Sequence, residues 1–113
     1  MVVGRDSLIA VYIMTNRRHG TLYVGVTSSL ITRAMHHRSG QFGGFTARHG
    51  LKQLVWYEPF ELMTNAIRRE TRVKKYPRDW KINLIEAANP EWEDLLPGLL
   101  GWRADNVWGQ ARP

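Results

Sequence analysis

The sequence contains no cysteine, and this absence removes several classes of protein at once. Without thiols there is no disulfide framework, no cysteine-ligated zinc finger and no cysteine nucleophile. The apolar run near the N-terminus, residues 8–14, is too short to span a bilayer, and no cleavage site typical of a secretory signal accompanies it. We therefore expect a cytoplasmic protein without a membrane partner.

Acidic residues are missing from a long stretch of the chain, because residues 7–57 contain no Asp or Glu and hold six Lys and Arg side chains. The bias reverses after residue 81, since residues 82–113 hold five acids and only two bases. Residues 1–81 thus carry fourteen basic against five acidic side chains, within a whole-chain net charge of +6. A surplus of this kind favours a polyanionic partner such as nucleic acid or a membrane surface.

The length of 113 residues, 43% of them hydrophobic, predicts a single domain with a substantial core. Runs rich in β-branched and aromatic residues predict strands, and turn signals followed by helical spacing predict helices. The expected order is a hairpin of strands over 8–14 and 21–26, a helix from 30 to 39, a strand over 51–60, a helix over 64–75 and a helix capped by Asp79 that ends before Asn89.

The expected hairpin brings two tyrosines together. If its loop is centred between Arg17 and Arg18, the residue numbers of each cross-strand pair sum to 35, and Tyr12 lies directly opposite Tyr23 on one face. In an arbitrary hairpin such a pair would simply pack. Buried phenol groups nevertheless need polar partners.

The expected helix over 30–39 allows two inward faces. One face consists of Leu30, Arg33, Ala34 and His37, which places two cationic or titratable side chains where apolar residues are usual. A helix rotated toward Met35 would instead leave Arg33 and His37 at the solvent edge. The sequence alone favours neither orientation.

Glu70 lies on or beside the apolar stripe of the helix over 64–75, because Ala66, Ile67 and Val73 stand four and three positions before it and three positions after it, with Lys74 at the fourth position after it. A carboxylate is seldom buried without a partner, since removing its charge from water is costly. Two interpretations are open: an ion pair between Glu70 and an arginine, or a metal ligand.

The ordered set Ala10-Val11-Tyr12, Tyr23-Val24-Gly25, Arg33 and Glu70 resembles the GIY-YIG nuclease family. The likeness is greatest to its small standalone bacterial members, which are related to the catalytic domains of an excision-repair nuclease subunit and of homing endonucleases. It covers residues 8–96. Ala10 departs from the pattern, because the name motif has a glycine at this position.

The resemblance implies an α/β (α+β) fold, in which a three-stranded antiparallel sheet is flanked by three helices. It also implies cleavage of DNA phosphodiester bonds with a single divalent cation, Mg²⁺, for which Mn²⁺ can substitute. By position, Glu70 matches the metal ligand, Arg33 the arginine beside the scissile phosphate, Tyr23 the proposed general base and Tyr12 its partner. His37 falls where members place a His or Tyr near the nucleophile.

The residue types suit this chemistry. The fork of an arginine matches two phosphate oxygens, and one carboxylate is enough to bind a hydrated Mg²⁺. A tyrosine is a poor base near neutral pH unless nearby cations favour its phenolate, and His37 is the other candidate for the proton step. Asn83 matches the late asparagine of some members, whereas Val26 replaces a lysine that others carry near the site.

We expect a metal-dependent endonuclease, structure-selective and linked to DNA repair or recombination by analogy alone. The predicted domain spans residues 1–96 and is followed by an irregular tail, residues 97–113. An alternative is a nucleic-acid-binding module with little activity, and a less favoured one is a protein-interaction domain that uses Trp102 and Trp108. The predicted DNA-binding residues are Arg17, Arg18, Arg38, Arg48, Lys74 and Lys75.

Overall fold

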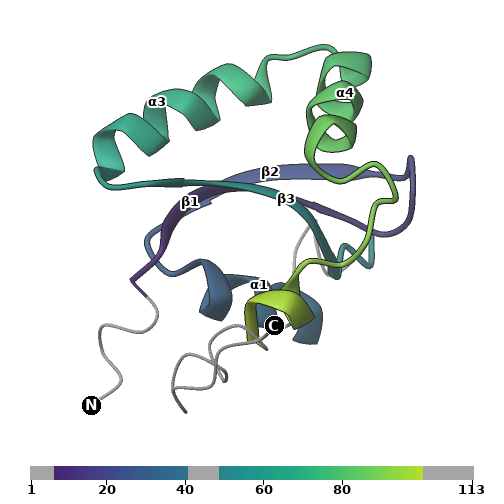
Figure 1. Cartoon of the computed structure of the whole chain (residues 1–113), viewed down its shortest axis with the longest axis horizontal. Helices are drawn as coiled ribbons and strands as arrows, with labels where there is room; N and C mark the ends of the chain where they lie inside the picture. Colours follow the sequence, from purple (N-terminus) through teal and green to yellow (C-terminus); the bar gives the residue numbers. More distant parts are fainter. Residues whose placement is uncertain (1–6, 41–48, 101–113) are drawn as a thin grey trace, which may run out of the picture.

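The computed structural model describes residues 7–40 and 49–100 (Figure 1). Along them follow β1 (Ile9–Thr15), β2 (Leu22–Thr27), α1 (Leu30–Ser39), β3 (Gln53–Phe60), α3 (Met63–Lys74) and α4 (Arg78–Ala88). The described strands form one antiparallel sheet in the order β2-β1-β3. This architecture confirms the expected three-stranded α+β fold.

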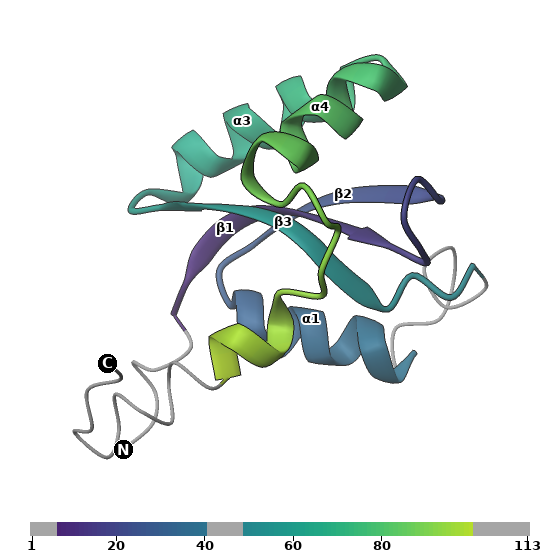
Figure 2. The same cartoon turned by 45° about the vertical axis from the view of Figure 1, so that its right-hand side comes forward.

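The sheet is the middle layer of the molecule, with α1 on one face and α3 and α4 on the other (Figures 1 and 2). Because side chains alternate along a strand, Tyr12 and Met14 of β1 pack toward α1, while Val11 and Ile13 pack toward α3 and α4. The central strand β1 is therefore covered on both faces. This explains why its sequence is a continuous apolar run rather than an alternating one.

The predicted register of the hairpin is wrong by two residues. Tyr12 pairs with Gly25, and Met14 pairs with Tyr23, so the numbers of paired residues sum to 37. The loop is wider than expected because side chains of the turn bind its backbone: the Thr21 N–H donates to the Asn16 side-chain oxygen at 3.0 Å. A shift of two residues preserves the face, and both tyrosines still point toward α1.

Helix α1 combines the two orientations considered from the sequence. Its buried residues are Leu30, Ile31, Ala34 and His37, whereas Met35 is 48% exposed. His37 therefore points inward, as the first orientation required. The helix ends as expected at Gly40, which has a left-handed φ of 74° that favours glycine.

The chain after α3 departs from the expectations in two places. Helix α4 begins at Arg78 with Pro77 before it, so Asp79 lies in the first turn and is not the cap. Residues 96–100 form a helical turn beside α1 (Figure 2), where an irregular tail was expected from residue 97. Leu96 is buried in the core against α1 because it can cover apolar surface there.

The remaining expectations concern segments outside the described residues. Arg48 belongs to residues 41–48, and Trp102 and Trp108 belong to residues 101–113. Within the described residues, no helix is long and apolar enough to cross a membrane.

Candidate active site

Three aromatic side chains meet beneath α1 and form what we call the tyrosine cluster: Tyr12 of β1, Tyr23 of β2 and His37 of α1. The ring centres of Tyr12 and Tyr23 are 6.2 Å apart, and those of Tyr23 and His37 are 5.4 Å apart. The Tyr12 hydroxyl lies 3.0 Å from Nε2 of His37, within hydrogen-bond distance. The Tyr12 hydroxyl thus has a polar partner, as a buried phenol requires.

The tyrosine cluster depends on Gly25, the residue opposite Tyr12 in the sheet. A Cβ at position 25 would lie 2.6 Å from the hydroxyl oxygen of Tyr12, far closer than atoms can approach. Glycine therefore makes room for the phenol to cross the neighbouring strand. This spatial requirement explains why the Tyr23-Val24-Gly25 triplet ends in glycine.

Burial moves the titration of two members of the cluster in opposite directions. Desolvation, together with the neighbouring Tyr23, raises the pKa of Tyr12 well above its usual value near 10. Desolvation and the nearby charge of Arg33 lower the pKa of His37 to about 4. At neutral pH, Tyr12 therefore keeps its proton and His37 is uncharged.

Arg33 lies one helical turn before His37 on α1 and is half-buried. Its positive charge lowers the pKa of both His37 and Tyr12, so the guanidinium lies within electrostatic reach of the tyrosine cluster. An arginine at this edge is well suited to bind an anion, because its fork presents paired donors.

Glu70 approaches from the other layer, on α3, a helix that packs along β2 and β1. Glu70 is only 9% exposed, and its negative charge contributes to raising the pKa of Tyr12. Oε2 of Glu70 lies 2.8 Å from Nζ of Lys74, one turn further along α3. The buried carboxylate therefore has a partner, and that partner is a lysine rather than the arginine considered from the sequence.

The carboxylate of Glu70 fits a hydrated divalent cation. Within the described residues, no three His, Asp or Glu side chains gather into a metal-binding group, so a fully protein-ligated cage does not form there. Mg²⁺ commonly binds through one or two carboxylates and keeps several waters. A single carboxylate that already binds a cationic group meets this requirement.

The predicted DNA-binding residues fall into two groups. Arg17 and Lys75 are exposed. Arg18 lies 3.6 Å from Glu91, and Arg38 forms an ion pair with Asp94. The acidic residues of the C-terminal part thus neutralise some of the basic side chains of the first half.

Asn83 is exposed on α4, which packs against β3, whereas the tyrosines lie on β1 and β2. Sequence reasoning missed the contact of Gly25 with Tyr12 and the partner of Glu70. The spacing of Glu70 and Lys74, four residues apart on one helix, was the available signal for the ion pair. It also missed Asp94, which accepts from the Leu54 N–H at 3.2 Å and ties the C-terminal part to β3.

The fold and the candidate site are those of a small nuclease domain, and the comparison with protein families identifies which one. The model of the GIY-YIG catalytic domain matches residues 8–83, and the chain belongs to this family. Its domain is a nuclease domain that acts on DNA, generally with a metal ion.

The chain is similar to small proteins of the same kind. A UPF0213 protein of Staphylococcus saprophyticus is 32% identical over 68 residues, which are 60% of this chain and 83% of that protein. A UPF0213 protein of Staphylococcus aureus is 33% identical over 67 residues, which are 59% of this chain and 82% of the relative. No solved structure matches the chain.

Proposed function

We propose that this protein is an endonuclease that hydrolyses DNA phosphodiester bonds with Mg²⁺, for which Mn²⁺ can substitute. The observation that carries the proposal is the meeting of Tyr12, Tyr23 and His37 within the electrostatic reach of Arg33 and Glu70. Titrating groups whose pKa values are displaced by burial and by specific charges are typical of functional sites. We further propose a preference for branched or nicked DNA and a role in repair or recombination.

In this proposal Tyr23 is the general base. His37, with a pKa of about 4, is a weak base near neutral pH, and Tyr12 keeps its proton because its pKa is raised. Tyr12 also forms a hydrogen bond with Tyr23, which helps Tyr12 to retain its own proton. His37 then holds Tyr12 in place through the 3.0 Å contact between Nε2 and the hydroxyl.

In the proposed step, a water oxygen attacks phosphorus and passes one proton to Tyr23. The bond from phosphorus to the leaving deoxyribose oxygen breaks, and this oxygen takes up a proton from a solvent water. Arg33 binds the phosphate oxygens and stabilises their growing negative charge. A divalent cation bound by Glu70 would supply Lewis-acid stabilisation on the leaving side.

Lys74 favours a second candidate, a DNA-binding module with little activity. Its ammonium group already binds the carboxylate on which a metal would depend, at 2.8 Å. The two candidates predict similar DNA affinity and differ in cleavage.

The decisive experiment is a cleavage assay with Mg²⁺ or Mn²⁺ on linear, nicked, branched and single-stranded DNA. We expect Glu70→Ala to abolish cleavage while DNA binding survives, because the metal ligand is lost and the basic surface is not. Glu61→Ala is the matched control, since Glu61 is an exposed carboxylate just before α3. Cleavage by Glu70→Ala at the rate of the control would refute the site, and absence of cleavage with every metal and DNA would favour the binding module.

A further inference from the structure

Helix α3 presents different side chains on its two flanks. Glu70 and Lys74 share the flank directed to β2 and the tyrosine cluster. Arg68 and Arg72, four residues apart and therefore on one side of the helix, line a groove on the opposite flank. The groove also includes Asn65 and Arg69 of α3 and Glu58 and Phe60 of β3, and its volume is about 400 Å³.

The groove is positively charged, and two of its arginines are available to bind an anion. Its single acid, Glu58, is bound by Arg69, whose Nε donates to Oε1 at 2.9 Å. Arg69 also donates to the hydroxyl of Tyr76 at 3.2 Å, so it is fixed in position. Arg68 and Arg72 are exposed, and neither has an ion pair within the described part of the chain.

We propose that this groove binds a backbone phosphate of DNA at a distance from the cleaved bond, with Arg68 and Arg72 as the phosphate ligands. Arginine forks match phosphate oxygens, and half-buried Phe60, which also lines the groove, offers an apolar surface on which a sugar or base can rest. The volume lies within the range of about 300–1,000 Å³ that is usual for ligand sites and admits a nucleotide.

The dimensions of α3 fit one DNA molecule at both flanks. A helix with its side chains is about 10 Å wide, and each nucleotide advances a strand of duplex DNA by about 3.4 Å. A strand with its scissile phosphate beside Glu70 therefore reaches the groove about three nucleotides further along. The proposal rests on the proposed nuclease function for this placement.

A charge-matched pair of double variants tests the groove. The first is Arg68→Gln with Arg72→Gln; the control is Lys52→Gln with Lys81→Gln, which removes two positive charges from positions outside the groove. The probe is a 20-base-pair duplex whose dissociation constant is measured from low to moderate salt, with folding of each variant checked by circular dichroism. Each lost phosphate contact lowers the slope of log affinity against log salt by about 0.9.

We expect the arginine double variant to bind the duplex about tenfold more weakly than the control. The slope of its log affinity against log salt should be smaller by the equivalent of nearly two phosphate contacts. Its cleavage rate at saturating DNA should match the control, because the tyrosine cluster and Glu70 are untouched. Equal affinity and equal slope in the two double variants would overturn the groove. If no variant cleaves DNA but the affinities differ as expected, the proposed nuclease function fails and the groove stands.

A substitution that makes the groove more positive gives a second test, because it should raise the affinity for the duplex. Glu58→Gln removes the acid of the groove and frees the guanidinium of Arg69, so we expect duplex affinity to rise about twofold. Glu61→Gln is the control, because it removes an equal charge from an exposed position outside the groove. A change in affinity equal for both variants would contradict the proposal, since it would reflect net charge alone.

Discussion

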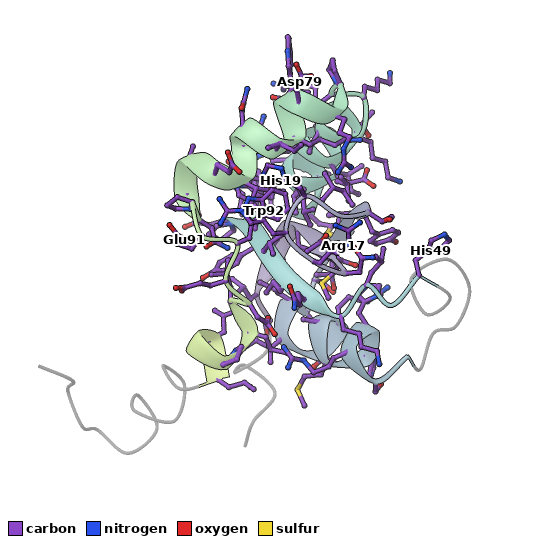
Figure 3. All side chains as sticks on the ribbon, turned by 90° about the vertical axis from the view of Figure 1, so that its right-hand side faces the viewer. Arg17, His19, His49, Asp79, Glu91 and Trp92 are labelled. Carbon is purple, nitrogen blue, oxygen red and sulfur yellow. The ribbon has the colours of Figure 1, made fainter. Side chains whose placement is uncertain are left out.

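The β1–β2 hairpin carries a polar cluster at its middle and another at its tip. At the middle lies the tyrosine cluster, buried beneath α1. At the tip, His19 and Trp92 lie side by side, with ring centres 5.0 Å apart (Figure 3). Oε2 of Glu86 is 2.8 Å from both Nε2 of His19 and Nε1 of Trp92, and we call these three residues the loop cluster.

The pKa values of titratable groups are shifted by different causes in the two clusters. In the loop cluster, donors from Trp92 and His19 satisfy the carboxylate of Glu86 and lower its pKa. These contacts help to hold His19 and Trp92 in left-handed backbone conformations, with φ of 57° and 58°, which are costly for residues other than glycine. In the tyrosine cluster, burial and the nearby charge of Arg33 keep His37 neutral, which lowers the free energy of unfolding only when the pH falls below about 6.5. We propose that the loop cluster serves stability and that the tyrosine cluster serves the reaction.

The largest effect is expected from Gly25→Ala. The added methyl group would overlap the end of the Tyr12 ring at 2.6 Å and displace its hydroxyl from His37. We expect cleavage to fall by about 100-fold or more and the free energy of unfolding to fall by about 1–3 kcal/mol. Gly98→Ala is the control, because a Cβ there meets no atom within 4 Å. Wild-type activity in Gly25→Ala would show that the close approach of Tyr12 to β2 is not needed.

The next effect concerns acid stability. The pKa of His37 is about 4 in the folded protein against 6.5 for an ordinary histidine, so the unfolded chain binds the proton more readily. His37 therefore lowers the free energy of unfolding as pH falls from about 6.5 to 4, by up to about 3 kcal/mol, and has little effect above that window.

His37→Gln should remove this part of the pH dependence, which urea unfolding at several pH values measures. Arg33, His36 and Tyr12 surround His37 and remain in this variant. His36→Gln is the control from the same helix. Parallel stability curves for wild type and His37→Gln between pH 6.5 and 4 would show that His37 is not held neutral by burial.

A smaller effect is expected at the loop cluster. Trp92→Phe keeps a ring against His19 but removes the hydrogen bond from Nε1 to Glu86, at a cost of about 1 kcal/mol in the free energy of unfolding. Cleavage at saturating DNA should not change, because the tyrosine cluster lies elsewhere on the hairpin. A parallel loss of activity and stability would show that the two clusters are coupled.

The sequence was sufficient for the order of the elements because hydrophobic periodicity and turn residues are local signals. It was also sufficient to place Tyr12 and Tyr23 on one face, because the period of two along a strand survives a register shift of two. The register itself was not predictable from strand residues, since the contact of Asn16 with Thr21 sets the width of the loop.

The resemblance was enough to propose the members of the candidate site, but their electrostatics could not be predicted from the sequence. Family resemblance supplied Arg33 and Glu70, and helical spacing left open whether His37 pointed inward. Its neutral state depends on burial under α1 and on the charge of Arg33, both of which are tertiary properties. The engagement of Arg38 by Asp94, 56 residues away in the sequence, had no local signal at all.

The smallest expected effect is a change in metal binding at Glu70, a carboxylate whose surroundings differ from those of Glu86 in the loop cluster. Glu86 is held by two donors, whereas Glu70 is bound by Lys74, whose side chain is 58% exposed. Ion pairs four residues apart on a helix contribute about 0.3–0.5 kcal/mol, so a metal bound at Glu70 would displace Lys74 at small cost. Lys74→Gln should therefore strengthen Mn²⁺ binding about twofold in the absence of DNA, measured by titration calorimetry.

Lys75→Gln is the matched control for that titration, because Lys75 is exposed and follows directly at the end of α3. Weaker Mn²⁺ binding in Lys74→Gln than in this control would mean that Lys74 orients the carboxylate for the metal. In that case Glu70 would resemble Glu86, a carboxylate fixed by its donors, and the contrast between the two regions would rest on the tyrosine cluster alone. Stronger binding would mean instead that the ammonium group of Lys74 competes with the metal ion for the carboxylate of Glu70.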